Sequence, residues 1–266
     1  MVRTLSGGGL ETLRYAADEA MVASSQGEEM SLSLLGSFRL AVRGRPRSVQ
    51  RSGQRLVAFL ALHGRCDRAF VAGMLFPEAG DDRANARLRS ILSRINRTVG
   101  HVVRASDGCL ELSANVIVDA VDLAAAARRV TEAGTALAAS RPTAEATDEE
   151  LLLQSAELLP GWYEDWVLVE RDRLVQLRVR ALEALVEDHL AVGRLAAASV
   201  AASTAVRVDP LRESTHRAII TVHLAENDPM AALRQYRAYE ELLAQNFHGA
   251  QPSRKLRELL ESLHDI

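Results

Sequence analysis

The chain is poor in several residue types, and each scarcity narrows the class of protein. Only two of its 266 residues are cysteines, Cys66 and Cys109, which form neither a disulfide framework nor a metal-ligand spacing. Aromatic residues make up only 4%, while alanine is abundant, which favours helices over an all-β sandwich. No apolar run approaches the roughly 18 residues of a membrane span, and no basic-then-apolar leader opens the chain. We expect a soluble cytoplasmic protein with two free thiols and no membrane partner.

The sequence also lacks the short motifs of common enzymes. It contains no P-loop, no HExxH and no nucleophile elbow, and the three glycines at 7–9 follow no predicted strand. His216 and His223 share a helix face at a spacing of seven, and His189 could approach them as a metal ligand. Packing or surface roles are more common for such histidines. We therefore expect no enzyme, no catalytic residue, no cofactor and no metal site.

The charge is unevenly distributed along the chain. The net charge is −3, yet residues 31–113 hold 14 arginines against 6 acidic residues, a balance of +8. Residues 114–266 hold 16 basic and 24 acidic residues, a balance of −8. A basic segment joined to an acidic one suggests a polyanion-binding domain fused to a domain with another task.

The basic segment has the pattern of a small α+β domain. Alternating apolar residues from Ser31 to Pro46 predict a small antiparallel sheet. Three helices should follow over residues 52–63, 67–76 and 81–99, the last with two opening aspartates that can cap its free N–H groups. Ser106-Asp107-Gly108 lies between β-prone runs and predicts a hairpin turn. Together these elements predict a winged helix-turn-helix.

The acidic segment predicts helices almost to its end, over residues 119–139, 147–160 and 165–192. His189-Leu190-Ala191 recurs as His223-Leu224-Ala225, an offset of 34 residues, which is the length of a tetratricopeptide repeat. The second copy lacks the terminal proline of the first, so an irregular α-bundle remains an alternative.

These patterns predict a mainly α protein with an α+β N-terminal part. We expect a flexible extension over residues 1–30, a winged-helix DNA-binding domain over 31–115 and an all-α tetratricopeptide-like domain over 116–266. Trp162, Tyr163 and Trp166 form an aromatic cluster, for which helix packing and a small-molecule or polymerase-facing pocket are both open.

The third predicted helix of the basic segment is amphipathic. On a helical wheel its apolar stripe comprises Ala84, Leu88, Ile91, Leu92, Ile95 and Val99. The opposite side carries Arg83, Arg87, Ser90, Arg94 and Arg97, and Arg89 lies between the two faces. Residues 83–99 thus contain five arginines and no acidic residue. Soluble helices usually interleave glutamate with arginine to gain i,i+4 pairs.

An acid-free arginine face suits a phosphate backbone, because each contact releases counterions and removes the repulsion between the arginines. We assign Arg87, Ser90 and Arg94 to base edges in the major groove, where arginine can bond guanine in bidentate fashion. Arg83, Arg89 and Arg97 are assigned to phosphates. The alternative is a solvated basic face or a docking surface for the acidic domain.

Two further arginines complete the predicted DNA-binding set. Arg104 enters the predicted wing, from which it could reach the minor groove or the backbone. Arg55 belongs to the predicted start of the first helix, and helix N-termini bind anions.

Several stretches carry a resemblance to a known family. In the first half they are Leu34–Phe38, Gln54–Leu60, Leu75–Pro77 and Ala84–Ile95. In the second half they are Leu159–Trp162, Arg207–Glu213 and Ala231–Tyr236. In this order and spacing, residues 31–266 resemble the Streptomyces antibiotic regulatory proteins, which join an OmpR-like winged helix to a bacterial transcriptional activator domain. The chain departs from the family at Phe76, where tryptophan is usual, and at Cys109, where tyrosine is.

The resemblance implies a transcriptional activator that binds direct repeats in double-stranded DNA overlapping a promoter's −35 element. It further implies recruitment of RNA polymerase through its sigma factor, two copies side by side on the DNA, and control of antibiotic biosynthesis genes. The competing hypothesis is a protein–protein adaptor that works through the helical repeats and uses the winged helix as a docking module.

Overall fold

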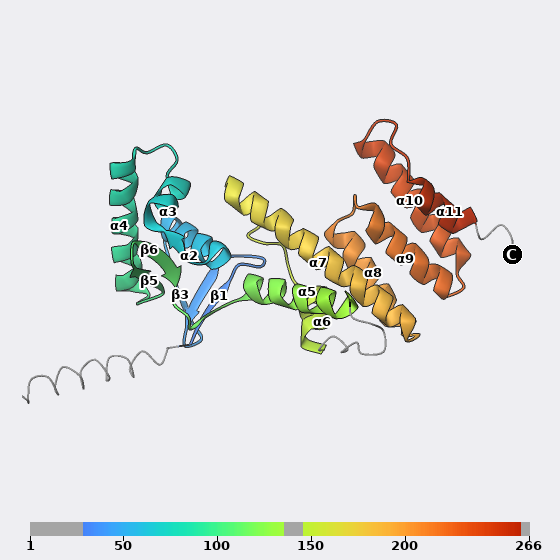
Figure 1. Ribbon diagram of the computed structural model, residues 1–266, viewed down its shortest axis with the longest axis horizontal. Coiled ribbons are helices and arrows are strands. Elements are labelled where there is room, and N and C mark those ends of the chain that lie inside the picture. Colours follow the sequence, from blue (N-terminus) through green and yellow to red (C-terminus); the bar gives the residue numbers. More distant parts are fainter. Residues whose placement is uncertain (1–28, 136–145, 262–266) are drawn as a thin grey trace, which may run out of the picture. The chain divides into compact units, whose positions relative to one another are not determined.

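The computed structural model describes residues 29–135 and 146–261, which form two compact units (Figure 1). Unit 1 comprises residues 29–34 and 38–118, and unit 2 comprises residues 35–37 together with the described residues from Asp119 onward. Almost all of the predicted extension over residues 1–30 lies outside the described residues. None of the helices within the described ranges has the length and apolar character needed to cross a membrane.

Unit 1 contains a four-stranded sheet with the strand order β3-β2-β1-β7. Its strands are β1 (Met30–Ser33), β2 (Arg39–Val42), β3 (Arg45–Arg47) and β7 (Val116–Val118). β1 pairs with β2 in antiparallel register, which places Leu32 opposite Leu40, and both side chains are buried. This is the antiparallel sheet that the alternating pattern predicts. β7 is an addition, because it pairs with β1 in parallel register and extends unit 1 three residues past Asn115.

Unit 1 also contains three helices that pack against one another. They are α2 (Arg51–His63), α3 (Arg68–Leu75) and α4 (Asp81–Thr98), which confirms the three predicted helices. Asp67 caps α3, since its Oδ1 accepts hydrogen bonds from the backbone N–H groups of Ala69 and Phe70 at 2.7 and 3.1 Å. The predicted capping of α4 by its aspartates is wrong. Gly80 is the N-cap residue and no side chain caps this end, so Asp81 and Asp82 act only as first-turn charges on the helix dipole.

A three-stranded sheet with the order β4-β6-β5 completes unit 1. Its strands are β4 (Cys66–Asp67), β5 (Val103–Ser106) and β6 (Cys109–Leu112). The turn of the β5–β6 hairpin has φ of 51° at Asp107 and 74° at Gly108. Two successive positive φ angles are the requirement of a type I′ turn, which explains the Asp-Gly pair in the sequence. The hairpin is the wing, and the predicted winged helix-turn-helix is confirmed.

Unit 2 is helical. Its helices are α5 (Asp119–Thr135), α6 (Ala146–Gln154), α7 (Asp165–Ala191), α8 (Leu195–Val208), α9 (Glu213–Ala225), α10 (Pro229–Asn246) and α11 (Arg254–Glu261). The predicted break at residues 140–142 lies outside the described residues. The predicted helix over residues 147–160 ends early, at Gln154, because the next residues leave the helix and Leu158 forms an isolated β-bridge with Leu35. Leu158 is apolar because it is buried in this bridge, and in the sequence its apolar character looked like a continuation of the helix.

The repeat is visible in the hydrogen bonds of two interhelical turns. In the α7–α8 turn, Gly193 and Arg194 donate their N–H groups to the carbonyls of Leu190 and His189 at 3.1 and 2.8 Å. The α9–α10 turn has the same two bonds 34 residues later, from Asn227 and Asp228 to Leu224 and His223, at 3.1 and 2.9 Å. Gly193 and Asn227 have φ angles of 71° and 56°, so both helices end in a left-handed residue. The tetratricopeptide-like spacing is therefore confirmed.

Small residues allow these helix pairs to pack closely. The inner face of α8 is made of alanines, among them Ala198, Ala201, Ala202 and Ala205, which are all buried. Trp162 and Trp166 are also buried, at 5% exposure each, whereas Tyr163 is 77% exposed. The two tryptophans therefore belong to the packing of unit 2, and the tyrosine does not share their environment.

Candidate nucleic-acid interface

Helix α4 has the two faces that the wheel predicts. Its buried residues are Ala84, Leu88, Ile91 and Ile95, and the helix packs against α2, α3 and β5. Leu92 is only partly buried and so lies at the edge of the stripe. All six predicted contact residues are exposed: Arg83, Arg87, Arg89, Ser90, Arg94 and Arg97. The outer face of α4 is thus available to a partner.

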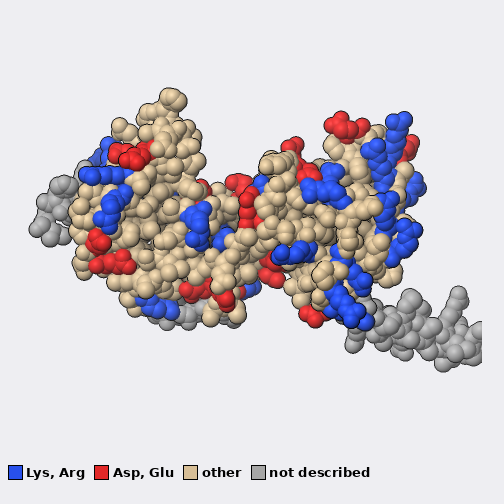
Figure 2. Space-filling view, turned by 180° about the vertical axis from the view of Figure 1, so that it is seen from behind, with Lys and Arg blue, Asp and Glu red and all other residues tan. Residues whose placement is uncertain are grey.

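No carboxylate of the described residues neutralises this face. Among the residues that the structure describes, none of the five α4 arginines forms an ion pair. Figure 2 shows basic side chains gathered on the α4 side of unit 1, at the right of that view, with few acidic ones among them. Self-repulsion between neighbouring guanidinium groups is therefore left for an external anion to relieve.

Two of the α4 arginines are positioned by neighbours that the sequence did not reveal. The guanidinium carbon of Arg87 lies 5.6 Å from the ring centroid of Phe76, a cation–π contact. Arg94 donates a hydrogen bond from Nη1 to the side-chain oxygen of Gln50, the N-cap residue of α2. The sequence signal for the contact between Arg87 and Phe76 was the presence of an aromatic residue shortly before α4. Gln50 gave no signal, because its proximity to Arg94 depends on the packing of α2 against α4.

The two outlying arginines differ in their surroundings. Arg104 is exposed on β5, where its strand partner in register is Glu111. Arg55 lies in the second turn of α2, since the helix begins at Arg51, and it is only partly exposed with its Nε shielded from solvent. The geometry therefore supports Arg104 more than Arg55 as a DNA contact, and both roles remain predictions.

The two cysteines lie beside each other on paired strands but remain free thiols. Burial raises the pKa of the Cys66 thiol, and the neighbouring Cys109 adds to this shift. A thiol with a raised pKa is a weak nucleophile at neutral pH. Cys66 therefore has the character of a structural residue at the base of the wing.

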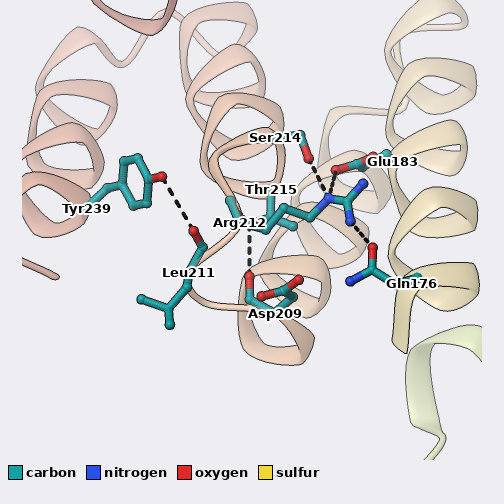
Figure 3. Close-up of polar contacts among 8 residues, drawn as sticks. All are labelled: Gln176, Glu183, Asp209, Leu211, Arg212, Ser214, Thr215 and Tyr239. Carbon is teal, nitrogen blue, oxygen red and sulfur yellow. Dashed lines mark hydrogen bonds and ion pairs between the residues drawn. The ribbon is translucent and has the colours of Figure 1, made fainter. Parts of the chain in front are cut away.

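The family-like stretch Arg207–Glu213 forms the turn between α8 and α9 (Figure 3). Arg212 donates hydrogen bonds to the side chains of Ser214 at 2.8 Å and of Gln176 on α7, and lies 3.7 Å from a carboxylate oxygen of Glu183. The Thr215 hydroxyl lies within hydrogen-bond distance of the carbonyls of Asp209 and Arg212, at 3.2 and 2.7 Å. This stretch fixes the geometry of the turn.

His216 completes the network around the turn. Its Nε2 lies 2.7 Å from the Pro210 carbonyl, to which it donates, and its Nδ1 accepts from the Gln235 amide at 2.9 Å. Its ring stacks on Tyr239, with the centroids 4.2 Å apart, and the Tyr239 hydroxyl donates to the Leu211 carbonyl at 3.4 Å. Burial lowers the pKa of His216, so the ring stays neutral.

Both nitrogens of the His216 ring are therefore engaged within the protein. His189 and His223 lie beside carboxylates, of Glu149 at 3.0 Å and of Glu226 at 3.3 Å. Within the described ranges, no group of three or more potential ligands is arranged to hold a metal ion. The three histidines serve packing and local hydrogen bonding.

Comparison with known proteins identifies a domain family and a structure of similar fold. Residues 121–264, more than half of the chain, match the bacterial transcriptional activator domain. A solved structure of EmbR from Mycobacterium tuberculosis, in complex with a low-affinity phosphopeptide, matches with a TM-score of 0.69 at 21% sequence identity. The alignment covers 89% of this chain and 65% of the EmbR chain, so the present chain spans less than two thirds of the length of that relative. No curated protein matches the sequence at a significant level.

The EmbR match shows that the two kinds of unit described above occur together in a solved structure of the same fold. The match over residues 121–264 falls on unit 2, and the winged helix-turn-helix precedes it in the chain. The chain therefore belongs to the bacterial transcriptional activator domain family, with a winged helix-turn-helix preceding that domain.

Proposed function

We propose that the protein binds double-stranded DNA through the exposed face of α4, which enters the major groove. The observation that carries this proposal is the row of five exposed arginines on α4, none of which is paired with a carboxylate among the described residues. An α-helix fits the major groove, and a cationic face gains free energy there by releasing counterions from the phosphates.

The contacts of individual arginines support a division of roles. Arg87 and Arg94 are held by Phe76 and Gln50, so these side chains lose less conformational freedom when they engage a base edge. Ser90 lies between them on the same face and is short enough to allow a close approach. In the described part of the chain, Arg83, Arg89 and Arg97 have no such anchor, which suits contacts with phosphates, whose positions vary less with sequence.

The family supplies the remainder of the proposal. Two copies bind direct repeats near a −35 element, with half-sites about one helical turn apart so that both copies lie on one side of the DNA. Unit 2 then contacts the RNA polymerase holoenzyme through its sigma factor, and the regulated promoters serve antibiotic biosynthesis. Such a regulator needs no cofactor and works in the cytoplasm, beside the chromosome.

Fluorescence anisotropy with labelled promoter fragments from the neighbouring genes tests this proposal. Arg87→Ala and Arg94→Ala should each weaken specific binding by roughly 1–3 kcal/mol, the discrimination of one bidentate contact. Arg97→Ala should weaken all fragments alike and reduce the slope of log affinity against log salt by about one phosphate contact.

Arg234→Ala is the matched control, because Arg234 is an exposed arginine of α10 in unit 2. It should leave both affinity and salt slope unchanged. If the α4 variants bind as the wild type does, the assigned face is wrong. If no promoter fragment is bound at all, the adaptor function becomes the better account of the chain.

A further inference from the structure

Unit 2 contains a cavity of about 480 Å³ that the proposed DNA binding does not use. It lies between α5, the segment that follows α6, α7 and the end of α8. Apolar side chains form part of its wall, including Leu123, Leu158, Leu174 and Val208. Its volume is in the range of pockets that hold small organic molecules.

Among the described residues, three arginines and one carboxylate line the same cavity. Arg171 is paired with that carboxylate, Glu157, at 2.9 Å. Arg178 is 8% exposed and donates from Nε and Nη2 to the carbonyls of Leu152 and Leu153, at 2.8 and 3.3 Å. These bonds leave the Nη1 hydrogens of Arg178 for another acceptor.

Arg207 enters the cavity from α8 as the third cation. Its guanidinium donates to the Thr204 hydroxyl at 3.2 Å. Burial, and in second place the positive charge of Arg207, lower the pKa of Arg178 to about 10. Within the described part of the chain, neither Arg178 nor Arg207 forms an ion pair. Two neighbouring guanidinium groups, one of them buried, therefore repel each other, while the Glu157 carboxylate of the cavity is paired with Arg171.

We infer that this cavity binds a small organic anion, with its carboxylate or phosphate on Arg178 and Arg207 and its apolar skeleton against the leucine and valine wall. The planar guanidinium groups match the two oxygens of such a group, and a ligand anion removes the repulsion between the two cations. The site is separate from the α4 face and does not depend on the proposed DNA binding.

Calorimetric titration of the full chain, without DNA, provides the test. The probes are decanoate and decyl phosphate, which distinguish a carboxylate from a phosphate, and decanamide, which has the same chain without the charge. At least one anionic probe should bind at least tenfold more tightly than decanamide. Arg207→Met should lower its affinity at least tenfold, and Arg207→Lys should lower it less.

Two further variants keep the result interpretable. Arg180→Met removes an exposed arginine of α7 that does not line the cavity, and it should leave the affinity unchanged. Val175→Phe reduces the volume of the cavity while keeping both cations, and it should also abolish binding. Equal binding of decanamide and the anions, or full affinity in Arg207→Met, would overturn the proposal.

Discussion

Arginine serves opposite purposes in the two units. On α4 of unit 1 the arginines point away from the core, and none forms an ion pair among the described residues. In unit 2 several arginines are turned inward, and Arg171 alone donates to the carbonyls of Leu158, Leu159 and Trp162 at 2.9, 2.7 and 3.1 Å. The guanidinium of Arg129 forms a two-point pair with Asp148, with distances of 2.8 and 2.6 Å.

The difference shows that the hydrogen-bond acceptors around an arginine, more than its position on a helix, decide whether it stabilises the protein or faces solvent. Guanidinium is planar and carries five donors, so it can close a loop by bonding several carbonyls at once. The segment between α6 and α7 provides such carbonyls, whereas among the described residues the α4 arginines bond a single acceptor, the side-chain oxygen of Gln50. An arginine without internal acceptors is left for an external anion.

The largest expected effect comes from removing an inward arginine. Arg171→Met should lower the free energy of unfolding of unit 2 by about 3 kcal/mol, because it leaves partly buried carbonyls without a donor, at about 1–3 kcal/mol each. Both tryptophans of the chain lie in unit 2, so tryptophan fluorescence during urea denaturation reports its unfolding.

Arg180→Met, on the same helix but exposed, serves as the control and should change the unfolding free energy by less than about 0.5 kcal/mol. Equal losses in the two variants would mean that the inward and outward arginines of α7 do not differ in the way proposed.

A smaller effect should appear with pH, again in unit 2. Because burial lowers the pKa of His216 in the folded state, the unfolded state binds the proton more readily. The contribution of His216 to the free energy of unfolding is fully present above the pKa of histidine in the unfolded state, about 6.5. It is lost as the pH falls through the lower pKa of the folded state, by at most about 1.4 kcal/mol per pH unit. Urea denaturation followed by tryptophan fluorescence between pH 7.5 and 5 measures this loss.

His216→Gln should weaken this pH dependence, since glutamine does not titrate. It should also lower stability at pH 7.5, because the stacking on Tyr239 is lost. A variant that keeps the full wild-type slope between pH 6.5 and 5 would assign the acid sensitivity to another group.

The smallest expected effect concerns the outward arginines in the absence of DNA. Arg97→Gln should leave unit 1 as stable as the wild type or raise its stability by a few tenths of a kcal/mol, because it relieves repulsion within α4. Amide hydrogen exchange of the buried residues of α2 measures this change. A loss of more than about 1 kcal/mol would show that Arg97 stabilises unit 1, and the contrast between the units would weaken.

The elements that could be predicted were those with local signals. The period of α4 placed its apolar residues inward and its arginines outward, and the Asp-Gly pair fixed the turn of the wing through its positive φ angles. The offset of 34 residues in the helical half appears in the structure as two turns with matching hydrogen bonds. Each of these features depends on residues that are close in sequence.

The features that were missed or wrongly predicted depend on contacts between residues that are far apart in sequence. The three residues of β7 are too few for a recognisable alternation, and they form a strand only because β1 offers a parallel edge. Leu158 resembled part of a helix, yet its burial comes with a bridge to Leu35, more than a hundred residues earlier. The contacts of Arg94 with Gln50 and of Arg178 with the carbonyls after α6 are likewise between distant segments.

By itself, the sequence determined which residues of each helix meet water and where the chain turns, because side-chain periodicity and backbone φ preferences act within a few residues. Only the tertiary structure decided which arginines find acceptors inside the protein and which do not, and where Arg178 and Arg207 meet across a cavity. Hydrogen bonds and charge repulsion act over a few ångströms in space, whatever the separation along the chain.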